Sequence, residues 1–465
     1  MGHEPALRAA AEHAVDYLGT VADRPVGPPV DPDALRARLG GDLPAAGEDP
    51  VAVVDALVAD LDPGIVASAG PRYFGFVTGG NLPAAVAADW LGSAWDNNTA
   101  MYVMSPAIAV VEEVAARWVL DVLGLPADAS VGFTTGASAA NLVGLAAGRH
   151  HVLQDKGWDV EANGLIKAPQ IRLVAGEEAH ASLLSAARLA GLGERTWQLV
   201  AIDDQGAMRP EALRAAVDDW EGPLLVAAQV GNVNSGACDP IGDLAPIVHE
   251  RGGWLHVDGA FGLWAGASPS RRRLVTGIDQ ADSWATDAHK WLNTPYDCGI
   301  AVVADPVVHR GATASTASYY VTGGDRRDGF DWVPEASRRG RGLPVYAALR
   351  SLGRQGVADL VDRCCDLAAR MAQALQDGGV EILNDVVLNQ VVIRFPPTSG
   401  TDATVHRDAV LAAVHRDGTC WIGGTTWRDL PAARVSVSGW STTAEDIDRS
   451  AAAILAAAGT VSGGA

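Results

Sequence analysis

The segment Asp282–Gly299 reads "DSWATDAHKWLNTPYDCG", and it follows an apolar stretch, Leu255–Gly262, that reads "LHVDGAFG". The pair His289-Lys290 in the first segment is the most informative feature of the chain. A lysine amine forms a Schiff base with a carbonyl compound, and removal from water makes the amine nucleophilic near neutral pH. Lys290 is therefore predicted to bind an aldehyde cofactor. The alternative is that His289 and Lys290 have only a structural role, because a lone lysine in a protein is usually a solvated surface residue.

Asp258 ends the apolar stretch, where burial of its carboxylate needs a compensating partner. The protonated ring nitrogen of pyridoxal phosphate is such a partner, and this cofactor also needs a lysine. Ala260, two residues further on, leaves room for a flat ring. The alternative for Asp258 is a carboxylate that caps the next turn. The presence of Asp258 and Lys290 in this order favours the cofactor.

The segment Gly132–Asn141, "GFTTGASAAN", is predicted to be a strand, a turn of small residues and a helix start. Small residues let the backbone approach an anion, and the first amides of a helix attract negative charge. Ala137 and Ser138 are therefore candidate phosphate contacts. An ordinary tight turn between a strand and a helix is the alternative.

Two further polar residues follow predicted strands. His180, in "GEEAHASL", is placed to stack on a planar ring or to act as a base, although such a histidine is often only a helix cap. Asn232, in "QVGNVNSGACDPI", is a candidate cofactor contact. A polar turn explains the same asparagine equally well.

Short β-branched runs alternate with amphipathic stretches in the middle of the chain. Five runs are predicted strands: "VGFTT" (131–135), "IRLVA" (171–175), "LLVAAQV" (224–230), "GWLHVD" (253–258) and "CGIAVV" (298–303). This alternation predicts a mostly parallel sheet covered by helices, with ligands collected at the carboxyl ends of the strands. The candidate residues described above lie close to those ends.

The remaining sequence predicts the domain organisation. Residues 1–70 are rich in alanine and are expected to form an N-terminal helical arm. Residues 71–342 form the predicted large α/β domain, which includes a mobile loop at 322–342 that is rich in glycine and arginine. Residues 343–465 are expected to form a small α+β domain.

The composition of the 465-residue chain, 48% apolar and 20% charged, is that of a globular enzyme. A formal net charge of −21 argues against a nucleic-acid surface, which needs clustered Lys and Arg. No apolar run is long enough for a membrane span, and no signal peptide is visible. The five cysteines match neither a zinc site nor a disulfide framework, so we expect no metal and a cytoplasmic location.

Six segments occur in an order that is specific to one enzyme family. They are "PRYFGF" (71–76), "SPAIAVVEEVAARWVLDVLGLP" (105–126), "GASAAN" (136–141), "EEAHAS" (177–182), "LHVDGAFG" (255–262) and "HKWLNTPYDC" (289–298). The chain therefore resembles the group II pyridoxal-phosphate-dependent amino-acid decarboxylases, the family of aromatic-amino-acid and glutamate decarboxylases. The resemblance implies pyridoxal 5'-phosphate as cofactor, fold type I as in aspartate aminotransferase, and a homodimer with active sites at the subunit interface.

The resemblance also implies roles for single residues. Lys290 would hold the cofactor as a Schiff base, Asp258 would pair with the ring nitrogen, and His180 would stack on the ring opposite Ala260. These first three are the implied catalytic residues. Further cofactor contacts are implied for Ala137, Ser138, His289 and Asn232, the last standing where the family has a threonine. The expected substrate pocket comprises Phe76, Trp95, Asn98, Met101, Tyr102, Phe330 and Arg434.

The chain departs from the family pattern at three places. Gly70-Pro71 replaces a His-Pro pair, and Asp287 replaces an asparagine two residues before the family's histidine. The family's mobile loop carries a tyrosine that returns a proton to the carbanionic carbon. In this chain the loop "DRRDGFDWVPEASRRGRG" has Gly329 and Phe330 where we place that tyrosine.

The implied activity is that of a carboxy-lyase that converts an L-amino acid to an amine and carbon dioxide. Without the loop tyrosine, either Tyr319 or Tyr320 supplies the proton, or oxygen intercepts the carbanion to give an aldehyde, ammonia and hydrogen peroxide. Carbon–sulfur β-elimination is a further alternative. An aminotransferase and a non-catalytic scaffold that binds the cofactor are less favoured. The sequence does not choose between aromatic, acidic and sulfur-containing substrates.

Overall fold

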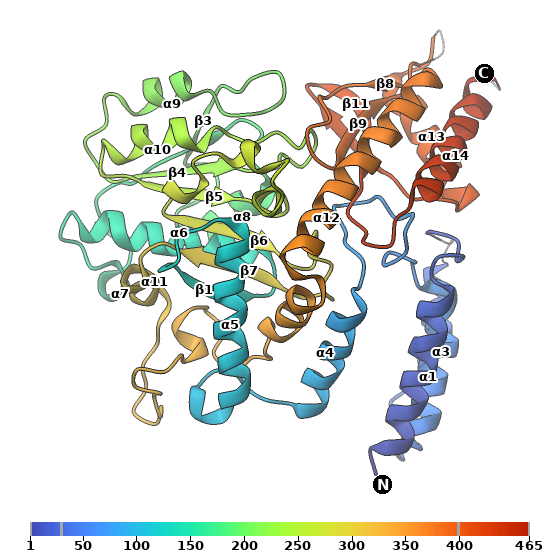
Figure 1. The fold of residues 1–465 in the computed structure, drawn as a ribbon, viewed down its shortest axis with the longest axis horizontal. Helices are drawn as coiled ribbons and strands as arrows, with labels where there is room; N and C mark the ends of the chain where they lie inside the picture. The colour runs from blue at the N-terminus through green and yellow to red at the C-terminus, as the bar shows by residue number, and fades with distance from the viewer. Residues whose placement is uncertain (1, 28–30, 398–399, 464–465) are drawn as a thin grey trace. The chain divides into compact units, whose positions relative to one another are not determined.

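The computed structural model describes residues 2–27, 31–397 and 400–463, and the chain forms two compact units (Figure 1). The large unit consists of Gly79–Ala368 and Asn384–Gln390. The small unit consists of the described residues within Met1–Thr78, Ala369–Leu383 and Val391–Ala465. The divisions thus fall at Thr78 and Ala368, where the sequence predicted divisions near residues 70 and 343.

A seven-stranded sheet in the order β1-β7-β6-β5-β4-β2-β3 forms the core of the large unit. Six of its strands are parallel, which confirms the predicted mostly parallel sheet. Their residues are largely buried apolar side chains, as expected for strands covered on both faces. The strands are β1 (Ser130–Thr134), β2 (Arg172–Gly176), β3 (Trp197–Val200), β4 (Leu224–Gln229), β5 (Trp254–Asp258), β6 (Ser283–Asp287) and β7 (Gly299–Val303).

Strand β7 is antiparallel to both of its neighbours, β1 and β6. The reason lies in the connection from β6 to β7, residues 288–298, which contains no helix. A parallel partner needs a crossover connection, usually a helix, whereas a short return gives an antiparallel pair. This connection carries His289 and Lys290, so the pair lies directly beyond the carboxyl end of β6.

Helices surround this sheet (Figure 1), and α6 packs against β5, β6 and β7. The helices of the large unit are α4 (Pro83–Trp95), α5 (Pro106–Leu123), α6 (Ala137–Gln154), α7 (Val160–Asn163), α8 (Ala181–Leu189), α9 (Pro210–Val217), α10 (Ile241–His249), α11 (Pro306–Thr313) and the first part of α12 (Gly342–Asp377). The short 3₁₀ helices are η2 (Tyr102–Met104), η3 (Gly262–Ala267), η4 (Arg272–Val275), η5 (Ile278–Gln280) and η6 (Gly329–Asp331).

The small unit contains a four-stranded sheet in the order β10-β11-β9-β8. In it β10 is antiparallel to β11, and β8 is antiparallel to β9. Its strands are β8 (Glu381–Ile382), β9 (Gln390–Arg394), β10 (Gly423–Trp427) and β11 (Leu430–Ser436), and its helices are α1 (Glu4–Thr20), α2 (Pro32–Leu39), α3 (Pro50–Leu61), η1 (Asp62–Gly64), α13 (Ala403–Asp417) and α14 (Ala444–Gly463).

The second and third N-terminal helices, α2 and α3, begin at Asp-Pro pairs. The Asp31 side chain accepts a hydrogen bond from the backbone N–H of Asp33, and Asp49 does the same for Val51 and Ala52. Proline in the first turn suits this arrangement because its missing N–H would have no partner there. The sequence therefore fixes the starts of α2 and α3 locally.

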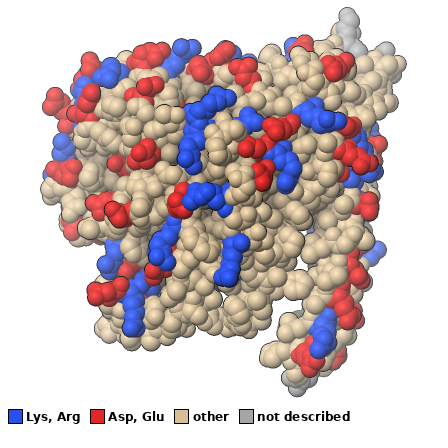
Figure 2. Space-filling model, viewed as in Figure 1, with Lys and Arg blue, Asp and Glu red and all other residues tan. Residues whose placement is uncertain are grey.

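Acidic and basic side chains are interspersed on the face of the molecule drawn in Figure 2. Exposed ion pairs occur among the described residues, such as Arg370 Nε with Asp448 Oδ1 at 2.6 Å. Exposed pairs of this kind contribute little to stability, because water and salt screen the charges. No helix among the described residues is both long enough and apolar enough to cross a membrane.

Candidate active site

Lys290 is the only lysine of the chain that is not exposed. The sequence contains two others, Lys156 and Lys167, and both are exposed to solvent. The side chain of Lys290 is 20% exposed, and its Nζ lies 3.0 Å from Oδ2 of Asp287. One amine is thus held in a largely enclosed position just beyond the end of a core strand, as a covalent cofactor anchor requires.

Asp287, the last residue of β6, connects Lys290 to helix α6. Its carboxylate is buried, and Oδ1 accepts a hydrogen bond of 2.6 Å from the backbone N–H of Ala137. The residue before the helix, Gly136, provides no side-chain cap, so Asp287 satisfies one of the free amides of the first turn. Asp287 stands where the family has an asparagine, so a carboxylate lies beside both the amine of Lys290 and the first turn of α6.

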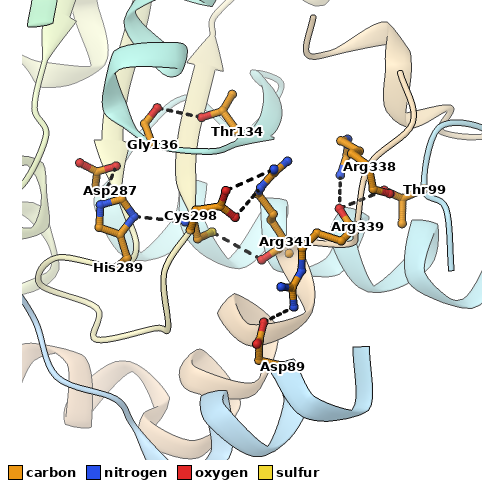
Figure 3. A network of polar contacts seen from close by, with 12 residues as sticks. Asp89, Thr99, Thr134, Gly136, Asp287, His289, Cys298, Arg338, Arg339 and Arg341 are labelled. Carbon is orange, nitrogen blue, oxygen red and sulfur yellow. Dashed lines mark hydrogen bonds and ion pairs between the residues drawn. The ribbon is translucent and has the colours of Figure 1, made fainter. Parts of the chain in front are cut away.

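His289 lies between Asp287 and Cys298 (Figure 3). Its Nδ1 accepts a hydrogen bond of 3.1 Å from the backbone N–H of Cys298, which assigns the ring proton to Nε2, 3.6 Å from Oδ1 of Asp287. Burial lowers the pKa of His289, and the neighbouring Lys290 lowers it further, although Asp287 opposes the shift. The imidazole is therefore neutral near pH 7, and its Nε2 proton lies on the side of the Asp287 carboxylate.

Asp258, at the end of β5, is a buried carboxylate with two hydrogen-bond donors. Its Oδ2 accepts from Nδ2 of Asn141 at 3.0 Å, and its Oδ1 accepts from the backbone N–H of Ala260 at 3.2 Å. Within residues 2–27, 31–397 and 400–463, no ion pair is found for this carboxylate. A buried anion without a cation is costly, so the site suits a ligand that brings positive charge to Asp258.

His180 and Asp258 line the same cavity, together with Gly176, Ala179 and Leu183. The His180 ring also caps α8, because its Nδ1 accepts from the backbone N–H of Ser182 at 3.2 Å. His180 therefore does cap a helix, as the alternative interpretation of the sequence expected. This cap is compatible with contact to a ligand. Capping fixes the ring beside the cavity and leaves its face exposed.

Asn232 follows β4, the strand next to β5, and only 1% of its surface is exposed. Its Oδ1 accepts hydrogen bonds from the backbone N–H groups of Asn234 and Ser235, so it does form a polar turn. Its Nδ2 is buried without a hydrogen-bond partner. An unpaired buried donor costs about 1–3 kcal/mol, which a bound cofactor would offset.

The predicted phosphate contacts differ in accessibility. Ala137 is buried and its N–H already donates to Asp287, whereas Ser138 is exposed on the first turn of α6. Taken with the lone carboxylate of Asp258, the enclosed amine of Lys290 and the free amide of Asn232, this donor set fits a phosphorylated pyridine aldehyde.

The expected substrate-pocket residues lie in both units. Asn98 holds the main chain locally, since its Oδ1 accepts from the N–H of Ala100 and its Nδ2 donates to Ser337. Tyr102 donates its backbone N–H to Asp328 at 2.7 Å. These contacts bring the segment that holds Trp95, Asn98, Met101 and Tyr102 against residues 328–338 within the large unit.

Phe76 and Arg434 belong to the small unit. Phe76 is 66% exposed, has a left-handed φ of 55° and stacks on Trp421 with ring centres 5.2 Å apart. A non-glycine residue in this conformation stores strain, which is common at ligand-binding positions. Burial lowers the pKa of Arg434 to about 10, so it remains a cation at neutral pH.

The loop predicted at 322–342 contains η6, ends at the first residue of α12 and makes buried contacts with the rest of the large unit. Arg338 forms a bidentate ion pair with Glu112 at 2.7 and 2.8 Å, and both side chains are 1% exposed. Arg338 also accepts a backbone hydrogen bond from Thr99 through its carbonyl oxygen (Figure 3). Phe330 is 4% exposed and donates its N–H to the carbonyl of Ala100.

Tyr319, by contrast, is 75% exposed in the irregular stretch between α11 and η6. Its ring lies edge-on to Tyr320, with centres 4.9 Å apart, and Tyr320 in turn contacts Phe330. The hydroxyl of Tyr320 raises the pKa of Tyr319 through a hydrogen bond, so Tyr319 keeps its proton near neutrality. The exposed aromatic side chain of this region is therefore Tyr319, while Phe330 is packed inside.

Three comparisons with known proteins all indicate the same protein family. Residues 32–395 match the model of the pyridoxal-dependent decarboxylase conserved domain. Phenylacetaldehyde synthase of Arabidopsis thaliana is 28% identical over 429 residues, covering 88% of this chain and 86% of the relative. Aromatic-L-amino-acid decarboxylase of Bacillus atrophaeus is 26% identical over 451 residues, covering 94% and 92%.

The crystal structure of Oryza sativa TDC with PLP and tryptamine has a TM-score of 0.91 to this chain, at 24% identity, over 98% of this chain and 97% of the other. This similarity confirms the predicted fold type I. The family match spans most of the chain and includes strand β5, which ends at Asp258, and the β6–β7 connection, which carries Lys290. The chain therefore belongs to the pyridoxal-dependent decarboxylase family, and it is an amino-acid decarboxylase that uses pyridoxal 5'-phosphate.

Proposed function

We propose that the enzyme converts an aromatic L-amino acid to the corresponding amine and carbon dioxide. The observation that carries the proposal is the presence of an enclosed amine, Lys290, after strand β6 and of a buried carboxylate, Asp258, at the end of the neighbouring strand β5, which forms no ion pair among the described residues. The aromatic class is supported by the names of the relatives and by the exposed rings of Phe76 and Trp95. We also propose, as a functional division of the chain, the boundaries predicted from the sequence: residues 1–70, residues 71–342 with a mobile loop at 322–342, and residues 343–465.

The proposed roles follow from the geometry of each side chain. When bound, the cofactor supplies an electron sink for the bond to the carboxyl carbon. Lys290 anchors the cofactor aldehyde, and Asp258 keeps the ring nitrogen protonated. His180 offers its exposed ring face for stacking, opposite the small Ala260. His289 donates through Nε2 towards Asp287, which orients the Lys290 amine.

The remaining contacts position the phosphate and the substrate. Ser138 and the first turn of α6 would hold the phosphate, and the unpaired Nδ2 of Asn232 would donate to the cofactor. Arg434 is a cation suited to a carboxylate, and Tyr319 Oη is the proposed donor of the proton that returns to the α-carbon. Phe330 supports the loop from its buried position.

A second candidate is decarboxylation coupled to oxidative deamination, which the similarity to a phenylacetaldehyde synthase favours. In that reaction the amino acid, oxygen and water give an aldehyde, carbon dioxide, ammonia and hydrogen peroxide. The presence of an exposed Tyr319 supports the amine instead. The two candidates share every residue that anchors the cofactor and differ in whether the α-carbon takes up a proton or reacts with oxygen.

Product analysis separates the two candidates. The cofactor-loaded protein is incubated in air with aromatic, acidic and sulfur-containing amino acids, and products are identified by mass spectrometry. We expect an amine as the main product from an aromatic substrate. An aldehyde with an equal amount of peroxide would overturn the amine proposal, and turnover of acidic substrates alone would overturn the aromatic class.

We further propose that the enzyme is a cytoplasmic homodimer. Helix α3 is strongly apolar yet has no buried residue, and Leu57 and Val53 are 47% and 42% exposed. Contiguous apolar surface of this kind usually marks an interface, and a second copy of the chain is the proposed partner. All five cysteines are free, which supports a reducing compartment.

The dimer proposal predicts a particle of twice 48.1 kDa in sedimentation equilibrium. Leu57→Asp is expected to weaken the dimer by on the order of 10-fold or more, because a charge would be buried in an apolar interface. Leu43→Asp is the matched control, since Leu43 is 94% exposed and lies outside the helices. A monomeric wild-type protein, or equal effects of the two variants, would contradict the proposal.

A further inference from the structure

A chain of hydrogen bonds runs from Asp258 into the interior of the large unit, and we call it the Asp258 relay. It consists of Asp258, Asn141, His256, Ser283 and Trp254. The Asn141 amide joins Asp258 at 3.0 Å and His256 Nε2 at 2.9 Å. His256 Nδ1 lies 2.8 Å from Ser283 Oγ, which accepts from Trp254 Nε1 at 2.8 Å. All five residues are at most 3% exposed.

The directions of the hydrogen bonds in the relay follow from the amide of Asn141. Its Nδ2 donates to the carboxylate of Asp258, so its Oδ1 faces His256 and accepts from Nε2 of the ring. With the ring proton on Nε2, the Nδ1 of a neutral His256 accepts from the hydroxyl of Ser283. The Ser283 oxygen in turn accepts from the indole N–H of Trp254, which can only donate.

The relay is therefore fully matched when Asp258 is ionised and His256 is neutral. Burial lowers the pKa of His256 to about 4, which keeps the imidazole neutral at pH 7 even beside Asp258. The position of the ring is also fixed, because a Cβ at Gly144 would lie 2.4 Å from its Cε1 and Nδ1. Helix α6 thus provides both Asn141 and the space for His256.

We propose that Asn141 and His256 are positioning residues that hold the carboxylate of Asp258 aimed at the ring nitrogen of the cofactor. The inference rests on the proposed role of Asp258. A carboxylate with few fixed contacts can otherwise rotate away from its ligand. The relay opposes this rotation, because Oδ2 receives a fixed N–H from Asn141 and Oδ1 receives the N–H of Ala260.

The test compares affinities for pyridoxal phosphate and its 1-deaza analogue, in which a carbon replaces the ring nitrogen. Wild type should prefer pyridoxal phosphate, because the analogue leaves Asp258 unpaired. In Asn141→Leu and His256→Leu this preference should fall on the order of 10-fold, as expected for loss of a residue that orients a ligand-binding group. The visible absorbance of the bound cofactor should change in the same variants.

His309→Leu is the matched control. His309 is also fully buried in the large unit, with Nδ1 2.8 Å from Ser130 Oγ and Nε2 2.9 Å from the carbonyl of Trp332. Its replacement removes a buried histidine and two hydrogen bonds without touching the relay. The ratio of the two affinities should stay within about twofold of wild type, since general destabilisation weakens both ligands equally.

The outcomes separate the relay from the role of Asp258. No preference in wild type would overturn the role of Asp258 and the relay together. A wild-type preference that persists in both relay variants would overturn the relay alone, as would an equal loss in His309→Leu. If His256→Leu does not fold, Ser283→Ala removes the donor to His256 Nδ1 with little change in volume, and an unaltered affinity ratio there would also count against the relay.

Discussion

Lys290→Ala is expected to abolish covalent attachment of the cofactor and to lower turnover by at least about 10³-fold, as for loss of a catalytic nucleophile. The reason is geometric as well as chemical. The other two lysines, Lys156 and Lys167, are exposed, so neither has the desolvated amine that favours reaction with an aldehyde. Attachment is measured by borohydride reduction of the loaded protein, followed by digestion and mass spectrometry of the lysine peptides.

The small number of lysines makes this measurement decisive. A stable modification should appear on the Lys290 peptide of wild type and be absent from the variant. Lys156→Ala and Lys167→Ala serve as controls and should keep both attachment and turnover. Modification of wild type at Lys156 or Lys167 alone, or turnover near the wild-type level in Lys290→Ala, would remove Lys290 from its assigned role.

The fold could be predicted largely from local patterns. Strands rich in β-branched residues alternate with helices, and β1, β2, β4, β5 and β7 were all expected close to their observed bounds. The sequence did not indicate β3 and β6, because "WQLV" and "SWATD" lack a clear apolar run. The antiparallel direction of β7 was also missed, since it depends on the length and path of the β6–β7 connection.

The candidate site could be predicted only in part, for a different reason. Lys290 and Asp258 sit in recognisable segments that follow core strands. The bond from Ala137 to Asp287 joins positions 150 residues apart, and that from Asn141 to His256 joins positions 115 apart. Each of these residues has an ordinary local sequence, and its role arises from tertiary contact alone. Asn141 is the last residue of the segment "GASAAN", but there the sequence indicated only the beginning of a helix.

The loop shows how composition leaves the tertiary contacts of a segment open. Its glycines and arginines predict an irregular, mobile segment, and the resemblance to the family places Phe330 where the family has its tyrosine. In the structure the Arg338–Glu112 pair is buried, and Phe330 is packed against Tyr320. Removing one partner of a buried pair costs about 3–5 kcal/mol, which explains why such a segment stays in place.

Tyr319→Phe is expected to change the product from amine to aldehyde. Loss of a positioned proton donor should slow amine formation by about 10²–10⁴-fold, which gives oxygen time to react at the α-carbon. The aldehyde should then appear in air with matching hydrogen peroxide and ammonia. Mass spectrometry of the products and a peroxide assay measure the formation of amine and of aldehyde from the same aromatic substrate.

Two neighbouring variants distinguish the hydroxyl of Tyr319 from its surroundings. Tyr320→Phe keeps that hydroxyl and should keep the amine as the main product, although it removes the hydrogen bond that raises the pKa of Tyr319. Phe330→Tyr adds a hydroxyl in a buried position and should lower stability without restoring amine formation to Tyr319→Phe. Amine as the sole product of Tyr319→Phe at the wild-type rate would show that another group protonates the α-carbon. Restoration by Phe330→Tyr would return the proton donor to the position first inferred from the sequence, because only a hydroxyl that reaches the α-carbon could rescue the amine.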